Sequence, residues 1–137
     1  MAQLLQTRRS ALGQLLEHAR RQPNQECCGL LAGSNGVITQ AFPARNAAKD
    51  PKRHYEIAPA EIVRLLREFR QRNLRFLGIY HSHPNGENVP SPRDIELAYY
   101  SEAVYFIVTP RPYASNPIRA FSIRDGRVDE LEIETVV

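Results

Sequence analysis

Apolar residues recur along two segments at the spacing of an amphipathic helix. In residues 8–21 and 59–72 they fall at i, i+3, i+4 and i+7, which places them on one helix face. The second segment begins with a proline, which suits a first helical turn. A third, shorter helix is expected over residues 92–101. The two apolar faces consist of Leu12, Leu15, Leu16 and Ala19 in the first helix and Ile62, Leu65, Leu66 and Phe69 in the second.

Runs of apolar and β-branched residues between these helices predict strands. Asn35-Gly36 and Asp125-Gly126 are dipeptides that favour tight turns, so each is expected to close a hairpin. The order of elements predicts a mixed α/β fold that ends on an antiparallel edge. The predicted strands cover residues 26–33, 37–41, 55–57, 74–81, 103–109, 118–124 and 127–134.

In one stretch the apolar residues follow neither the helical nor the strand period. Residues 45–54 are expected to form a surface loop, in which Asn46 makes a turn and His54 is an exposed ring. Three tyrosines near the motifs described below are assigned to the core: Tyr80, Tyr99 and Tyr100.

Length and composition predict one folded domain over residues 1–137. Hydrophobic residues make up 42% and charged residues 24% of the 137 residues, and a chain of this length can bury a core without disulfides. The only cysteines, Cys27 and Cys28, are adjacent and badly placed to bridge each other. No segment has the apolar length of a signal peptide core or a membrane span. We therefore expect a cytoplasmic protein with no membrane partner.

The charge pattern argues against a nucleic-acid partner. The net charge is only +3, and the arginines behind it are scattered through several segments. Four of them cluster around the second predicted helix, where a solvated helix face is the simplest interpretation and an acidic protein or a phosphate backbone is the alternative. These are Arg64, Arg67, Arg70 and Arg72.

Two histidines stand at the end of a predicted strand. In Gly78-Ile79-Tyr80-His81-Ser82-His83-Pro84 they are two residues apart, and alternate side chains of an extended chain share a face. Catalytic zinc sites typically take three protein ligands from His, Asp or Glu and leave the fourth position to water. Asp94 is the candidate third ligand, because the loop after His83 leads to a helix start at Ser91-Pro92. The pattern predicts one Zn²⁺ per chain, held by His81, His83 and Asp94.

Each part of this pattern also has a simpler interpretation. Ser91-Pro92-Arg93-Asp94 is a helix-capping pattern, and two histidines in one strand are alone a weak sign of metal. Glu26, at the start of an apolar strand, would alone be taken for a solvated flank. The joint spacing H-x-H, seven residues, S, two residues, D should arise by chance in roughly one of several thousand such chains. The combination therefore favours a metal site.

The combined motif resembles the signature of the JAMM metalloproteases, the catalytic branch of the MPN domains. Upstream, Pro23-Asn24-Gln25-Glu26-Cys27-Cys28-Gly29-Leu30-Leu31 resembles the family's strand with the catalytic glutamate. His18-Ala19-Arg20 resembles the family's first helix, and Phe42-Pro43-Ala44-Arg45-Asn46 resembles the loop after its second strand. The likeness covers most of the chain and departs at no expected catalytic position.

This resemblance implies an α/β fold and a set of roles. The fold would be a three-layer-like sandwich, in which helices flank a mixed, curved sheet, as in the cytidine-deaminase-like JAMM/MPN fold. By the same resemblance His81, His83 and Asp94 bind Zn²⁺, Glu26 acts as acid/base on the zinc-bound water, and Ser91 helps hold the oxyanion. A zinc deaminase of similar fold would need a P-C-x-x-C motif, which the sequence lacks.

The resemblance also implies a substrate class. A zinc metallopeptidase of this family would cut the peptide or isopeptide bond after the C-terminal glycine of a ubiquitin-like or sulfur-carrier β-grasp protein with a Gly-Gly tail. Release of cysteine from a carrier and removal of a carrier from lysines both remain open, and the prediction allows for a homodimer. The alternatives are a non-catalytic MPN-type scaffold module, which the intact set of ligands and base argues against, and a RadC-like nucleic-acid-associated protein, which the modest charge argues against.

Overall fold

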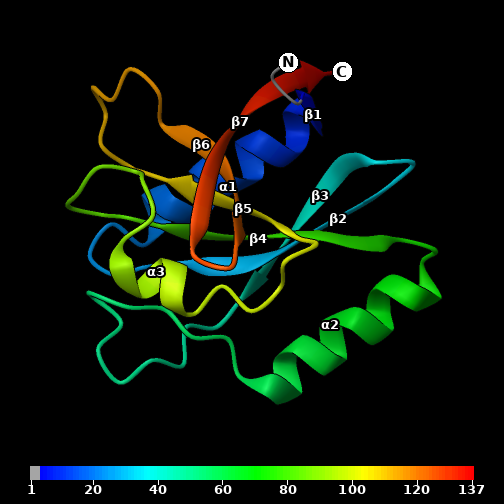
Figure 1. Ribbon diagram of the computed structural model, residues 1–137, viewed down its shortest axis with the longest axis horizontal. Helices are drawn as coiled ribbons and strands as arrows, with labels where there is room; N and C mark the ends of the chain where they lie inside the picture. The colour runs from blue at the N-terminus through cyan, green and yellow to red at the C-terminus, as the bar shows by residue number, and fades with distance from the viewer. Residues whose placement is uncertain (1–3) are drawn as a thin grey trace.

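The computed structural model describes residues 4–137 and shows a strongly curved mixed sheet with helices on both sides (Figure 1). Residues 1–3, which belong to the predicted domain, lie outside the described part. Within residues 4–137, no helix is long and apolar enough to cross a membrane. The elements are β1 (Leu4–Arg8), α1 (Arg9–Arg21), β2 (Cys28–Ser34), β3 (Val37–Ala44), α2 (Pro59–Gln71), β4 (Arg75–Ser82), α3 (Pro92–Glu96), β5 (Val104–Val108), β6 (Ile118–Arg124) and β7 (Arg127–Val136).

The sheet closes on itself in the order β1-β3-β2-β4-β5-β6-β7. Strand β1 closes the ring, because it pairs in parallel with β7 from Leu4↔Glu132 to Arg8↔Val136 and meets β3 at Thr7↔Ile38. The predicted α/β class with a mixed, curved sheet is confirmed, and the curvature extends to full closure. Strand β1 itself was not predicted. Its five residues show no alternation, and its partner β7 lies at the other end of the chain, so tertiary pairing decides its conformation.

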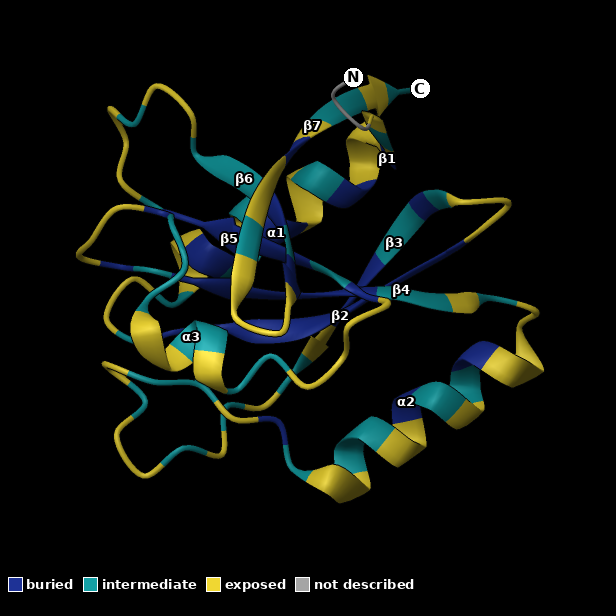
Figure 2. Cartoon of the chain, in the orientation of Figure 1, coloured by how far each residue is buried: buried dark blue, intermediate teal, exposed yellow. Residues whose placement is uncertain are grey.

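The core lies on both faces of the central strands, which Figure 2 shows as almost entirely buried. Successive residues of a strand point to opposite faces. Tyr80 and Phe106 therefore join the cluster that packs against α1, while Ile79 and Ile107 join the cluster that packs against α2. By the same alternation His81 shares the α2 face with Ile79.

Both predicted hairpin turns are confirmed. Asn35 and Gly36 have φ angles of 54° and 75°, and Asp125 and Gly126 have φ angles of 50° and 78°. Two successive positive φ angles match the right-handed twist of the flanking strands. The strand expected over residues 55–57 is wrong, because this segment runs extended without pairing to the sheet.

The third helix is shorter than expected and ends at Glu96 instead of 101. The helical hydrogen-bond ladder stops because the N–H of Ala98 donates to the carbonyl of Ile95 at 3.3 Å and that of Tyr99 to the carbonyl of Leu97 at 3.0 Å. The N–H of Tyr100 donates to the hydroxyl of Tyr105 at 3.1 Å. The core assignment holds for Tyr80, which is fully buried, and is wrong for Tyr99 and Tyr100. Their exposed fractions are 76% and 36%, because the short helix leaves them on the surface beside α2.

We predict opposite effects for two glycine-to-alanine changes. A Cβ atom on Gly29 would lie 2.5 Å from the ring of Tyr80. This ring is fully buried and has no space to move away. Gly29→Ala should therefore lower the free energy of unfolding by about 1–3 kcal/mol. Gly13, in the interior of α1, has open space around its Cα, so Gly13→Ala should raise this free energy by about 0.5–1 kcal/mol.

Urea unfolding of both variants and the wild type checks the pair. A stability of Gly29→Ala equal to that of the wild type would contradict the packing described for Tyr80.

Candidate metal centre

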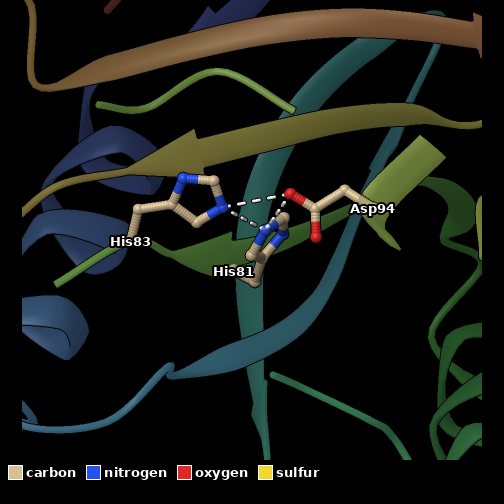
Figure 3. Close-up of side chains that lie close together, drawn as sticks. All are labelled: His81, His83 and Asp94. Atoms are coloured by element: carbon tan, nitrogen blue, oxygen red, sulfur yellow. Dashed lines mark hydrogen bonds and ion pairs between the residues drawn. The ribbon is translucent and has the colours of Figure 1, made fainter. Parts of the chain in front are cut away.

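Three side chains from separate parts of the chain converge at one end of the sheet. His81 belongs to β4, His83 follows directly after it, and Asp94 lies in the first turn of α3. Nε2 of His81 lies 3.1 Å from Nε2 of His83, and the Oδ2 atom of Asp94 lies 3.2 Å from the first and 3.0 Å from the second. Figure 3 shows the two rings and the carboxylate turned toward a common point. The structure therefore brings together all three predicted metal ligands.

The donor set fits a zinc ion. Ligand atoms about 2.0–2.1 Å from a tetrahedral zinc lie roughly 3.3 Å from one another. The three ligand atoms already form a triangle with edges of 3.0–3.2 Å. Two imidazoles with one carboxylate are a ligand set that catalytic zinc sites use. His81, His83 and Asp94 could thus hold the ion with little rearrangement.

His83 is oriented through its other nitrogen. Its Nδ1 atom lies 2.7 Å from the backbone oxygen of Glu87, which fixes the tautomer and leaves Nε2 free to bind metal. The loop that carries Glu87 is held by the buried Asn88, whose Nδ2 donates to the carbonyl of Asn116, just before β6, at 2.9 Å and to that of Ile107 in β5 at 3.4 Å. The backbone of His83 also donates to the carbonyl of Val108 at 2.9 Å. The position of His83 thus depends on the ends of β5 and β6.

Ser91 and Asp94 form a capping box at the start of α3. The hydroxyl of Ser91 accepts from the backbone N–H of Asp94 at 3.1 Å, and Oδ2 of Asp94 accepts from the backbone N–H of Ser91 at 2.9 Å. The cap interpretation is therefore right, and it does not compete with the metal interpretation. The cap holds the same oxygen that faces the histidines.

The charges of the three ligands are strongly coupled. Burial opposes ionisation of Asp94, yet hydrogen bonds from His81 and His83 outweigh it and hold the pKa of this carboxyl well below its ordinary value. Burial lowers the pKa of His81. Burial also acts on His83, but its hydrogen bonds to Asp94 and to the Glu87 carbonyl prevail and raise its pKa. Zinc binds the neutral imidazole, so it would compete with the second proton that the raised pKa of His83 favours.

Glu26 lies two residues before β2, which begins at Cys28 and not at residue 26 as expected, and it reaches the same face. Cys28 pairs with His81 in the antiparallel β2–β4 ladder, and the N–H of Ser82 donates to the carbonyl of Cys27 at 3.0 Å. Continuing this register sets Glu26 opposite His83, on the side of the sheet that carries both imidazoles. Glu26 is only 7% exposed, and burial raises its pKa to about 8, although the positive charge of His83 acts in the opposite direction. A carboxyl group poised near neutral pH can both accept and return a proton.

The adjacent cysteines belong to the core. Burial raises the pKa of Cys27 to about 11 and that of Cys28 to about 12, so both stay protonated thiols. Cys28 packs in the α2-side cluster and its Sγ lies 3.9 Å from the carbonyl oxygen of Ala44. Neither cysteine belongs to the group of ligand atoms described above.

Asn46 forms a turn, as expected, and also makes hydrogen bonds to distant parts of the chain. Its Oδ1 does accept from the N–H of Ala48 at 2.9 Å, as the turn requires. Its Nδ2 also donates at 2.8 Å to the carbonyl of Glu26 and, at the same distance, to the carbonyl of His54. The loop of residues 45–54 is thus tied to the segment just before β2 that carries Glu26. An asparagine is a common turn residue, so its type alone gave no sign of these long-range bonds.

Tyr55 is the second residue that sequence reasoning missed. Its ring stacks on His81 with the centroids 4.2 Å apart and the planes 18° from parallel. The preceding residue, His54, is half-buried and not an exposed ring as expected. No spacing rule links a loop residue to a ligand on a strand more than 20 positions later.

A groove of about 510 Å³ runs from Asp94 between α2 and α3. Most of its wall is apolar: α2 contributes Ile62 and Leu66, and β4 and β5 contribute Ile79 and Tyr105. The exposed tyrosines described above also line it, with Tyr55, Ile57 and Leu97 among the other members. One candidate ligand, Asp94, therefore lines this largely apolar groove.

Two comparisons of the sequence with known proteins agree with the site. A family model described as prokaryotic homologs of the JAB domain matches residues 8–124. The chain is 38% identical over 102 residues to the desampylase of Haloferax volcanii, which covers 70% of this chain and 73% of the relative. It is 31% identical over 135 residues to the CysO-cysteine peptidase of Mycobacterium tuberculosis, which covers 97% of this chain and 92% of the relative.

The fold has a close counterpart among solved structures. The protein DSY2949 from Desulfitobacterium hafniense has a TM-score of 0.84 and 27% identity, over 97% of this chain and 92% of the other. The family match spans all the predicted ligands and the base, from Glu26 just before β2 to Asp94 in α3. The chain therefore belongs to the prokaryotic JAB-domain family, within the JAMM/MPN-type zinc metalloproteases.

Proposed function

We propose that this hydrolase cuts the peptide or isopeptide bond after the C-terminal glycine of a ubiquitin-like or sulfur-carrier protein, with one zinc ion held by His81, His83 and Asp94. The observation that carries the proposal is the convergence of these three ligand atoms beside the buried Glu26. A binding module would have no use for a buried carboxylate that faces a metal site.

When bound at this centre, zinc would supply a Lewis acid that polarises the scissile carbonyl and lowers the pKa of a water molecule. Glu26 is the group that takes a proton from the attacking water and then gives it to the departing amine. Its position opposite His83 and its raised pKa support this double role.

Ser91 supports the developing charge on the substrate. Its Oγ accepts from the N–H of Asp94, which leaves the hydroxyl proton free to donate elsewhere. A donor aimed at the oxygen of a tetrahedral intermediate commonly contributes about 10²- to 10³-fold in rate. We assign Ser91 this role.

The family and the groove support the substrate class. The two relatives are named desampylase and CysO-cysteine peptidase, which fits a carrier protein whose C-terminal bond is cut. A tail ending in Gly-Gly has no side chains at its last two positions, so its backbone could approach a recessed metal closely. The preceding tail residues would lie extended in the apolar groove that ends at Asp94.

We predict that metal binding and catalysis separate in two variants. Wild-type protein should carry one zinc, His83→Ala should lose it, and Glu26→Gln should keep it. Glu26→Gln should lower cleavage of a β-grasp carrier with a Gly-Gly tail fused to a short peptide by about 10²- to 10⁴-fold, since a proton-transfer group is lost.

Zinc content by mass spectrometry and cleavage by gel assay check this prediction. A wild-type chain unable to bind supplied zinc would reject the peptidase proposal. Full activity in Glu26→Gln would reject only the role of Glu26.

A second prediction concerns Ser91. Ser91→Ala should lower kcat by about 10²- to 10³-fold and leave zinc affinity nearly unchanged, because Asp94 keeps its bond to the backbone N–H of residue 91. Ser91→Thr, which retains a hydroxyl and a cap, is the control and should keep most of the activity. Steady-state kinetics and zinc competition measure the two effects. Equal losses of zinc affinity and turnover in Ser91→Ala would show that the cap alone matters.

A third prediction follows from the raised pKa of Glu26. The folded state of the metal-free protein holds this proton more tightly than the unfolded state, so its contribution to stability is present at low pH and is lost as pH rises toward about 8. Glutamine does not titrate, so Glu26→Gln should not lose stability in this way as pH rises. The stability of the variant relative to wild type should rise by about 2 kcal/mol between pH 5 and pH 8, a value reduced for the solvent that still screens the carboxylate.

Urea unfolding in the presence of a chelator at both pH values tests this expectation. A stability difference between variant and wild type that stays constant with pH would contradict the burial of an ionisable Glu26.

A further inference from the structure

Tyr55 and His81 form a stacked pair between two separate parts of the fold. Tyr55 lies in the segment that leads from the 45–54 loop to α2, and His81 lies in β4. The rings are 4.2 Å apart at their centroids and nearly parallel, with an angle of 18°. Tyr55 therefore covers one face of a predicted metal ligand.

The two ligand histidines are oriented in different ways. Nδ1 of His83 is held by the carbonyl of Glu87, as is usual for a histidine that binds metal. Nδ1 of His81 is buried and has no hydrogen-bond partner among residues 4–137. Apart from the contacts of its Nε2 with Asp94 and His83, the orientation of the His81 ring is thus set by packing, and Tyr55 provides the flat surface against which the ring packs.

Tyr55 is itself held on both sides by one side chain. Nδ2 of Asn46 donates to the carbonyl of His54 at 2.8 Å, and Oδ1 of Asn46 accepts from the N–H of Glu56 at 3.1 Å. The peptide groups before and after Tyr55 are therefore both fixed. Since Nδ2 of Asn46 also donates to the carbonyl of Glu26, one amide connects the segment of Tyr55 to the segment of the candidate base.

We propose that Tyr55 is a positioning residue that directs Nε2 of His81 toward the metal by stacking on its ring, and that Asn46 holds Tyr55 in place. The stacking contact orients the ring of His81, just as the hydrogen bond from Nδ1 to the Glu87 carbonyl orients the ring of His83. This inference rests on the metal centre of the proposed function and not on the identity of the substrate.

The test compares a change that removes the aromatic face with one that keeps it. Tyr55→Leu fills much of the space without a flat ring, whereas Tyr55→Phe keeps the ring and loses only the hydroxyl. Loss of an outer partner of a metal-bound histidine typically weakens metal binding by 10- to 100-fold. Tyr55→Leu should therefore bind zinc about 10- to 100-fold more weakly than wild type, and Tyr55→Phe should bind it with nearly wild-type affinity.

Zinc affinity is measured by competition with a chelator, and the geometry of the site by the visible absorption of the cobalt-substituted protein. The cobalt spectrum should change in Tyr55→Leu and stay as in wild type in Tyr55→Phe. Tyr99→Leu is the matched control, because Tyr99 lines the same groove and is 76% exposed. It should leave both readouts unchanged.

Circular dichroism and thermal unfolding of the metal-free proteins first establish that each variant folds. If Tyr55→Leu does not fold, Tyr55→Met takes its place, because its flexible side chain fills space without a ring face. Wild-type zinc affinity and cobalt spectrum in the folded leucine or methionine variant would overturn the proposal. So would a loss in Tyr55→Phe as large as in Tyr55→Leu, since the hydroxyl and not the stack would then be responsible.

Failure of this inference is distinguishable from failure of the proposed function. A wild-type protein that binds no zinc removes the metal centre itself. A wild-type protein that binds zinc normally, with variants that bind it equally well, removes only the role of Tyr55.

Discussion

The site depends on burying a carboxylate between two imidazoles. Burying the charged carboxylate of Asp94 without partners would cost free energy. The two histidines and the backbone N–H of Ser91 compensate this cost with hydrogen bonds. Each partner comes from a different element, so the arrangement exists only when β4, the following loop and α3 are all in place. The sheet fixes β4 in place by pairing it with β2 on one side and with β5 on the other.

The buried Glu26 differs from Asp94, because neighbouring groups do not fully compensate the burial of its carboxylate. Its carboxylate loses hydration at the edge of the core, and nearby positive charge compensates it only in part, as its raised pKa shows. The same burial that disfavours its ionised form makes it a suitable proton carrier near neutral pH. Nδ2 of Asn46 donates to the carbonyl of Glu26, which lies before the first residue of β2 and outside its ladder. The loop thus supports a group that the sheet alone would leave loosely held.

Sequence reasoning succeeded where the signal is local. The hairpins follow from two dipeptides with positive φ angles, and His81 and His83 share a face because strands alternate with period two. It failed where partners are distant in sequence. Strand β1 exists because β7 pairs with it, Tyr100 bonds to the hydroxyl of Tyr105 instead of extending the predicted helix to residue 101, and Tyr55 stacks on a residue of another element. The roles assigned to Glu26 and Ser91 remain proposals, since no contact with substrate tests them.

The cap at Ser91 shows why a structural and a functional interpretation need not exclude each other. A capping box satisfies backbone donors at the start of a helix, and here its acidic member is the candidate ligand Asp94. The backbone N–H of Ser91 holds Oδ2 while both imidazoles approach the same atom, so the hydrogen bonds that begin α3 also aim the carboxylate. Because α3 has only five residues, it contributes little packing of its own. We therefore interpret the first turn of α3 as a structure whose main role is to position Asp94.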